Sequence, residues 1–408
     1  MATLCGKPVD RPAVNFYEVG GFKIDPSDPD EFNVYNDPSW QPLLRLAEEK
    51  TDLIRMRSPV KSRSHEVISD KSDRGRCRDE SRPSSTGCLA AKTGQDKFFE
   101  TKEYVERGCR FTSTSLKIGG RKMTALTRRS TDVDTVWTVE HLLKNTEDLK
   151  AYLELPGEIF AEDVDVTSLI EEDQKLADRG IIMVDTEDPI CAAASLFSME
   201  DFTVIALTEQ KLFHRLLEKL SEHIQTRTEK TAKAFPGHLW RIYGPEYATE
   251  PYLPPHLFKE YVVRYTGPMV KAIAEHGGFA RIHCHGRIKA ILNYIIEMGA
   301  AAIDPIEPPP HGDVELEYVR CKYGDELVLF GNLEIADIEN SEPGDFEKIV
   351  EKSLRDGTCG EPRPSQMGRG EGKGFVLMPS SAPTGRKITL RMMTNYQTMI
   401  RLTTRFNL

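Results

Sequence analysis

Two histidines and two glutamates lie where short apolar segments of the sequence end. His283 and His285 are at the end of one such segment, Glu246 follows an earlier segment, and Glu307 follows a later one. In a parallel α/β barrel, the carboxyl ends of all strands surround one opening, so such side chains come together there. Imidazole and carboxylate groups are ligands for a divalent metal ion such as Zn2+. The pattern therefore predicts a metal and catalytic site formed by His283, His285, Glu246 and Glu307.

Each of these residues also has a purely structural interpretation. Histidines two positions apart lie on the same side of an extended strand, where they often form a hydrogen-bonded pair without a metal. Glu246 could cap the following helical segment, and Glu307 could pair with Arg281 across the sheet. Cys284 lies between the two histidines, and we expect its thiol to point the opposite way into the core.

Neutral and aromatic side chains at other segment ends are candidates for binding a substrate. Asn332 and Ser380 or Ser381 follow the last two predicted strands, and hydrogen-bonding groups of this kind orient ligands. Tyr17 lies near the end of the first predicted strand, and Tyr243 ends the strand that precedes the first glutamate. We predict Tyr17, Tyr243, Asn332 and Ser380 as substrate-binding residues.

The elements that position these residues alternate between strand and helix. Five consecutive strand–helix units predict a right-handed parallel sheet. An early strand and a mid-chain strand bring the total close to eight, and no G-x-G-x-x-G follows a strand, so we expect a closed (β/α)8 TIM barrel and not an open sheet. The predicted strands are residues 13–18, 180–185, 239–243, 278–284, 301–306, 327–330 and 375–378.

Other segments predict departures from this repeat within a single domain that spans residues 1–408. Residues 43–53 and 137–153 have helical patterns, and residues 110–129 alternate in polarity around two glycines, which is typical of a hairpin. Residues 57–96 are rich in charged residues and serine, so we expect a disordered or loosely packed insertion. Residues 357–373 form a second polar insertion.

Composition excludes several classes of protein. The chain has 408 residues and a net charge of −10, which argues against general affinity for nucleic acid or anionic membranes. No apolar run approaches the roughly 20 residues that cross a bilayer, and the N-terminus lacks the apolar core of a secretion signal. Eight cysteines are scattered without a C-x-x-C motif. We expect a cytoplasmic protein.

Several runs of residues resemble the uroporphyrinogen decarboxylase superfamily, which also contains the zinc methyltransferases of corrinoid-dependent methyl transfer. The resemblance covers about residues 135–406 and, more weakly, residues 11–21. It implies a (β/α)8 barrel with its site at the carboxyl ends of the strands. The runs that carry it are residues 244–247, 283–286, 304–313, 331–333 and 377–383.

The resemblance is closer to the methyltransferases than to the true decarboxylases. The decarboxylases begin with R-Q-A-G-R-Y, whose arginines hold substrate carboxylates, whereas residues 15–21 here contain no arginine. The methyltransferase zinc motif is H-x-C-G with a later cysteine. His283 matches its histidine, His285 replaces its first cysteine, and Ser380 or Ser381 lies near the place of the second. The resemblance thus implies zinc held by His283, His285 and a glutamate, a stronger Lewis acid than the thiolate form.

The resemblance implies one predicted function, and the residues leave two alternatives. The prediction is transfer of a methyl group between a small methoxy, amine or thiol compound and a corrinoid (cobalamin) carried by a separate protein, with Asn332 and Tyr17 orienting the substrate. The first alternative is a metal-free decarboxylase in which His283 or His285 protonates the carbanion and Arg281 holds a carboxylate. The second is a barrel that binds a ligand without turnover. Sequence leaves the oligomeric state open, a homodimer included.

Overall fold

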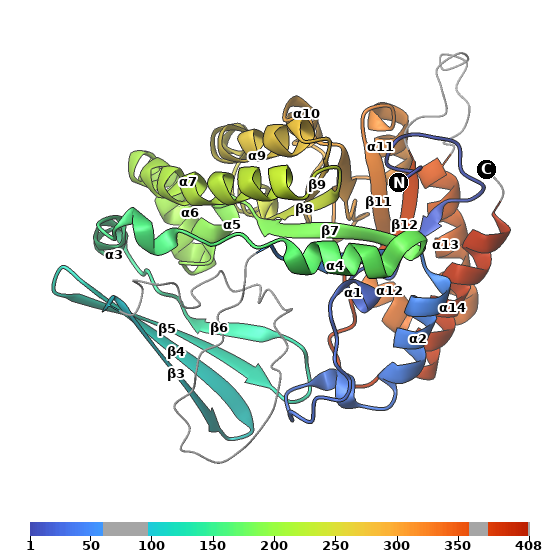
Figure 1. Ribbon diagram of the computed structural model, residues 1–408, viewed down its shortest axis with the longest axis horizontal. Coiled ribbons are helices and arrows are strands. Elements are labelled where there is room, and N and C mark those ends of the chain that lie inside the picture. Colours follow the sequence, from blue (N-terminus) through green and yellow to red (C-terminus); the bar gives the residue numbers. More distant parts are fainter. Residues whose placement is uncertain (60–96, 359–373, 407–408) are drawn as a thin grey trace.

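The computed structural model describes residues 1–59, 97–358 and 374–406, and its centre is a parallel sheet of eight strands (Figure 1). The strands follow the order β1-β12-β11-β10-β9-β8-β7-β2. Their bounds are β1 Ala13–Val14, β2 Leu53–Arg57, β7 Gly180–Glu187, β8 Leu239–Tyr243, β9 Phe279–His283, β10 Ala302–Asp304, β11 Val328–Leu333 and β12 Phe375–Pro379. Every ladder in this sheet is parallel. The predicted (β/α)8 barrel is confirmed.

Hydrogen bonds around Asp52 join the two outer strands of this order. The amide of Asp52 donates to the carbonyl of Val14 at 2.8 Å, and the amide of Val14 donates to Asp52 Oδ2 at 2.8 Å. The side chain of Asn15 donates to the carbonyl of Asp52 at 2.9 Å. Because Val14 belongs to β1 and Asp52 precedes β2, these bonds close the sheet into a barrel.

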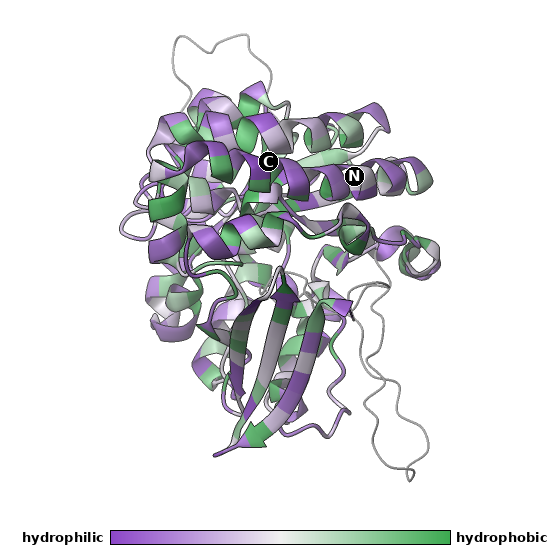
Figure 2. Cartoon of the chain, turned by 90° about the vertical axis from the view of Figure 1, so that its left-hand side faces the viewer, coloured by the Kyte–Doolittle hydropathy of each residue, from purple (hydrophilic) through white to green (hydrophobic). Residues whose placement is uncertain are grey.

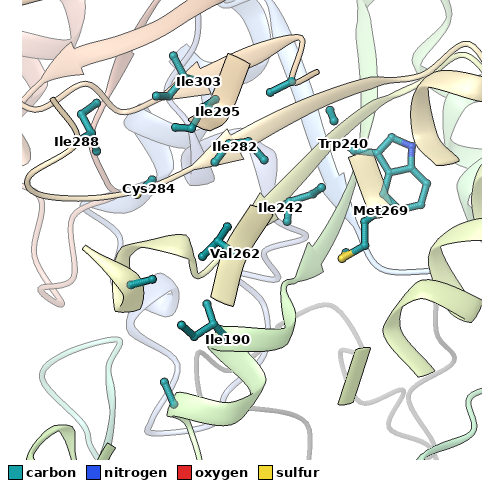
Figure 3. Close-up of a cluster of buried hydrophobic side chains, with 14 of the residues drawn as sticks. Ile190, Trp240, Ile242, Val262, Met269, Ile282, Cys284, Ile288, Ile295 and Ile303 are labelled. Carbon is teal, nitrogen blue, oxygen red and sulfur yellow. The ribbon is translucent and has the colours of Figure 1, made fainter. Parts of the chain in front are cut away.

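Helices surround the strands and bury one face each against them. In α7, Phe213, Leu216, Leu217, Leu220 and Ile224 lie on one face of the helix and are buried. Figure 3 shows the layer between strands and helices, where Trp240, Ile242 and Ile282 lie among helical side chains such as Val262 and Met269. The main helices are α2 Trp40–Lys50, α4 Thr167–Leu176, α7 Gln210–Ala234, α9 Arg264–Glu275, α10 Leu292–Glu297, α11 Leu316–Tyr323, α13 Pro343–Thr358 and α14 Leu390–Arg405.

Short helices occupy the connections between these elements. They are α1 Glu18–Gly21, α3 Thr146–Leu153, α5 Pro189–Ala194, α6 Met199–Thr208, α8 Pro255–Phe258 and α12 Ile335–Asn340. Residues 255–275 form α8, a π-helical segment Lys259–Val263 and α9, which contains Pro268. No helix within residues 1–59, 97–358 or 374–406 is long and apolar enough to cross a lipid bilayer.

The interior of the barrel changes from apolar to charged along the strands. Alternate residues of a strand face the same side. Met183 of β7 therefore shares the barrel interior with Asp185 and Glu187, and Leu239 of β8 shares it with Arg241 and Tyr243. In the strand registers, Asp185 lies beside Arg241, and Arg241 beside Arg281. One step further, at the carboxyl ends, Glu187 lies beside Tyr243, Tyr243 beside His283, and His283 beside Asp304. These two polar layers form the floor of the barrel mouth.

A separate antiparallel sheet stands beside the barrel, as Figures 1 and 2 show. It contains β3 Phe99–Glu106, β4 Cys109–Ile118, β5 Arg121–Ser130 and β6 Val136–Glu140 in that order. Leu116 and Met123 on its inner face are buried in the main core, and Arg110 pairs with Asp30 at 2.9 Å. The predicted hairpin is confirmed as β4 and β5. The predicted helix at Trp137 is wrong, because that residue belongs to β6 and only Thr146–Leu153 is helical.

The strand β2 was not predicted from the sequence. Its sequence is Leu-Ile-Arg-Met-Arg, and the prediction placed Leu53 in the preceding helix, placed Arg57 in the insertion and assigned no element to residues 54–56. The helix ends at Lys50, and Arg57 ends the strand. Most of the two predicted insertions, residues 60–96 and 359–373, lies outside the described residues, whereas Gly357 belongs to α13.

Candidate active site at the barrel mouth

His283 ends strand β9 and is held by a chain of buried charges. Its Nδ1 lies 2.7 Å from Asp304 Oδ2, and Asp304 Oδ1 lies 3.0 Å from Arg281 Nε. Asp304 and Arg281 are fully buried. Burial lowers the pKa of His283 to about 4, although the charge of Asp304 acts in the opposite direction. The imidazole is therefore neutral, donates its Nδ1 proton to Asp304 and leaves Nε2 as an acceptor.

Tyr17 covers the charged layer below His283. Its ring stacks on His283 at a centroid distance of 5.9 Å, and the guanidinium of Arg241 lies 5.5 Å from the same ring and donates to the phenol oxygen. Arg241 also pairs through two nitrogens with Asp185. Tyr17 has a φ of 57°, which is uncommon for an aromatic residue, and Asn15 Oδ1 accepts its amide proton at 2.7 Å. The local turn at Asn15 thus fixes Tyr17 over the barrel interior.

His285 lies beyond the end of β9 and carries a different charge from His283. Its Nδ1 lies 2.7 Å from Glu307 Oε1, and the amide of Gly286 donates to Glu307 Oε2 at 2.7 Å. Burial acts to lower the pKa of His285, but the hydrogen bond and charge of Glu307, with the charge of Glu246, raise it to about 9. The two imidazole rings meet edge to face at 4.6 Å. The mouth therefore places one neutral and one protonated histidine side by side.

Glu246 faces His285 from the neighbouring unit of the barrel. It lies in a short 3-10 helix, Pro245–Ala248, directly after β8, and accepts a hydrogen bond from the amide of Gly244 at 3.2 Å. Burial raises the pKa of this carboxyl, and the charge of His285 is the strongest influence in the other direction. Four of the predicted residues, His283, His285, Glu246 and Glu307, thus gather at one side of the mouth.

The four predicted substrate-binding residues are placed less uniformly. Tyr243 lies beside His283 in the strand register, and the guanidinium of Arg241 is 5.1 Å from its ring. Asn332 Oδ1 accepts a hydrogen bond at 2.9 Å from Ser353, a residue of helix α13, so its carbonyl group faces the helical layer. Ser380 Oγ donates to Glu334 at 3.3 Å. Cys284 is buried in the layer between strands and helices, as predicted (Figure 3).

Two acidic residues of the mouth were not predicted as site residues. Asp304 ends strand β10 directly beside His283, and Glu334 follows β11, so both occupy the strand-end positions that mark such sites. Their place at the end of an apolar run was the available signal. Nothing in the sequence linked Asp304 to His283, which lies 21 residues earlier, and only the strand register shows that the two residues are in contact.

The donors as arranged do not fit zinc. Both carboxylate oxygens of Glu307 accept hydrogen bonds, and His285 is protonated, whereas a ligand needs a free lone pair on its ring nitrogen. In the described parts of the chain, no three histidine, cysteine, aspartate or glutamate side chains are grouped so as to hold a metal ion. Zinc binding by His283, His285, Glu246 and Glu307 stays a prediction from the sequence.

The fold and the site define a (β/α)8-barrel protein with an acid–base cluster at the carboxyl ends of its strands. Residues 139–378, more than half of the chain, match the model of the uroporphyrinogen decarboxylase (URO-D) family. The chain belongs to this family, which confirms the resemblance seen in its strand-end motifs.

Of two solved structures that match the chain, one has a TM-score above 0.5. A methyltransferase from Methanosarcina mazei matches with a TM-score of 0.57 and 13% identity, over 99% of this chain and 97% of that chain. The GH20 catalytic modules of the pneumococcal exo-beta-D-N-acetylglucosaminidase StrH match with a TM-score of 0.34 and 8% identity, over 70% of this chain and 72% of that chain. No curated protein sequence matches the chain.

Proposed function

We propose that this protein is a methyltransferase that moves a methyl group between a small methoxy, amine or thiol compound and a corrinoid carried by a separate protein. Its family includes methyltransferases of this kind by the resemblance stated above, and the Methanosarcina methyltransferase shares its fold along almost the whole chain. The observation that carries the proposal is the distribution of charge at the barrel mouth.

Both arginines of the barrel interior are neutralised inside the protein. Arg241 pairs with Asp185 and Arg281 pairs with Asp304, each in the buried layer beneath Tyr17. The polar groups above that layer are carboxylates and imidazoles. A substrate with several carboxylates would meet like charges at this mouth, whereas a neutral or cationic methyl compound would not.

The position of Arg281 also argues against the decarboxylase alternative. That alternative needs Arg281 to hold a substrate carboxylate. The residue is fully buried, its charge is matched by Asp304, and its guanidinium lies 4.8 Å from the ring of Phe330 inside the barrel. The ring of Tyr17 also lies 5.9 Å from this guanidinium, so Arg281 is enclosed by protein groups.

The histidine pair suits the departure of a methyl group from a heteroatom. That heteroatom keeps the electrons of the broken bond, so it leaves more easily when it carries a proton, either its own or one donated by the protein. Glu307 fixes His285 through Nδ1, and we expect the Nε2 proton of His285 to be the donor. His283, neutral and oriented by Asp304, offers Nε2 as a hydrogen-bond acceptor.

Methylcobalamin can replace the corrinoid protein in a direct test. We expect the wild type to remove the methyl group from methylcobalamin when an amine, thiol or hydroxyl acceptor is present. The loss of methylcobalamin can be measured by its absorbance. His285→Gln should lower the rate about a hundredfold or more, the usual contribution of a positioned acid or base. His276→Gln is the matched control, because His276 also contacts a glutamate, at 3.0 Å, but lies at the end of α9 before strand β9 begins.

The outcomes separate the alternatives. Absence of demethylation with every acceptor, together with release of carbon dioxide from a small carboxylic acid, would refute methyl transfer and support the decarboxylase. Elemental analysis of the same preparations tests the zinc prediction. One zinc per chain that is lost in both His283→Ala and His285→Ala would confirm it, and would mean that metal binding displaces the His285 proton.

A further inference from the structure

Glu334 is a buried carboxylate that the acid–base chemistry of the histidines does not use. It directly follows strand β11 and is 7% exposed. Its Oε2 receives a long hydrogen bond of 3.3 Å from Ser380, whose own oxygen accepts the amide proton of Ile335. Its Oε1 is buried and has no hydrogen-bond partner among the described residues. A buried oxygen with a formal negative charge and no donor is costly, so this group is arranged for a partner that the chain does not supply.

The surroundings of Glu334 indicate the charge of that partner. The strongest charge acting on it is that of Glu307, which repels it, and the attraction from His311 on the exposed loop after β10 is weaker. Asp337 also repels it. Burial and these acids together raise the pKa of Glu334 to about 7.

The charges across the mouth do not balance. Glu246, Glu307 and Glu334 contribute three carboxylates, and His285, which pairs with Glu307, can offset only one of them. The buried arginines cannot offset the difference, because each is paired with its own aspartate. When all three glutamates are ionised, the mouth lacks a cation, and Oε1 of Glu334 lacks a hydrogen-bond donor.

We propose that the mouth binds a protonated methylamine, with the N–H of its ammonium group donating to Glu334 Oε1. This inference rests on the proposed methyl transfer and names its substrate class: an organic ammonium ion, not a methoxy or thiol compound. The carboxylates of the mouth favour a ligand with a positive charge. The buried Oε1 of Glu334 favours an ammonium ion that carries an N–H group over one whose nitrogen is fully alkylated.

An ammonium substrate also completes the proposed reaction. Its C–N bond breaks with the electron pair remaining on nitrogen, which leaves as a neutral amine with the proton that it already carries. The methyl carbon takes up the electron pair of the reduced corrinoid supplied by the partner protein. Glu334 takes no part in these bond changes, so it is a binding residue that fixes the amine.

Calorimetric titration of the whole protein with trimethylammonium chloride at about pH 8, where Glu334 is ionised, tests the site without any turnover. The neutral comparison is tert-butyl alcohol, which has nearly the same size. We expect trimethylammonium to bind and the alcohol to bind at least about tenfold more weakly. Glu334→Gln should weaken binding of the ammonium ion by about tenfold. Glu317→Gln, which removes an exposed carboxylate of α11, should leave binding unchanged.

Equal binding of the ammonium ion and the alcohol by the wild type would overturn the inference, whatever the stability of the variants. Unchanged ammonium binding in a folded Glu334→Gln protein would overturn it as well. Binding that depends on Glu334 without methyl transfer would support the ammonium site and refute the proposed function. Methyl transfer from a methoxy or thiol compound that is unaffected by Glu334→Gln would support the function and refute the ammonium site.

Discussion

Replacement of Asp304 by asparagine should destabilise the protein strongly, because it leaves a buried arginine without its counter-charge. The side chains of Arg281 and Asp304 are 1% and 0% exposed, and their closest atoms are 3.0 Å apart. Removal of one partner from a buried ion pair costs about 3–5 kcal/mol. His283 also loses the charged acceptor that lies 2.7 Å from its Nδ1. We therefore expect Asp304→Asn to lower the free energy of unfolding by about 4 kcal/mol.

Urea unfolding followed by tryptophan fluorescence measures this effect, since Trp40 and Trp240 are buried. The control is Asp345→Asn, because Asp345 forms a similar contact with Lys348 at 2.8 Å while both side chains are about 70% exposed or more. That change should leave the free energy of unfolding nearly unchanged, because an exposed ion pair is screened by solvent. The double change Arg281→Met with Asp304→Asn removes both charges and should recover much of the loss.

The reasoning would be refuted by a cost for Asp304→Asn no larger than that for Asp345→Asn. It would also be refuted if the double variant lost as much free energy of unfolding as the Arg281→Met and Asp304→Asn single variants combined. That result would mean that Arg281 and Asp304 contribute independently and that no unpaired buried charge is created.

Three further predictions concern pH, a glycine and the antiparallel sheet. The pKa of His285 is raised from 6.5 to about 9, so its contribution to stability is complete below pH 6.5 and is lost as the pH rises through about 9. Glu307→Gln should lower this pKa, measured by NMR, and flatten the stability profile between those values. Gly244→Ala should cost about 1–3 kcal/mol in urea unfolding, because φ is +115° and a Cβ would lie 2.1 Å from Cys191 Cβ. Leu116→Ala should cost about 2–5 kcal/mol, because this fully buried side chain joins the antiparallel sheet to the main core.

Two of these changes have a matched control variant elsewhere in the chain. An unchanged His285 pKa in Glu307→Gln would show that the charge of Glu307 does not hold the proton. Gly237→Ala has a similar φ of +77° but no atom within 4 Å of the added carbon, so it should cost less than Gly244→Ala. Val105→Ala changes an apolar side chain that is 56% exposed on β3 and should be nearly neutral. Equal costs for Leu116→Ala and Val105→Ala would contradict the proposed docking of the sheet.

Helical and strand periodicity predicted much of the barrel because each unit is a local pattern. The boundaries of β8 were predicted to the residue. The prediction failed where the pattern of a strand was mixed. Two of the five residues of strand β2 are arginines, and its identity comes from its hydrogen bonds to β7. The strand at Trp137 likewise depends on its antiparallel partner β5.

The sequence by itself determined the class of fold and the group of residues at the mouth, because strand ends and chemically reactive side chains can both be identified from local sequence patterns. Only the tertiary structure decided the state of each group. The same imidazole type is neutral at position 283 and protonated at position 285, since burial dominates in one case and two glutamates in the other. Asp304 and Glu334 gained their importance from neighbours on other strands, because charge and desolvation depend on distances in space that no local pattern contains.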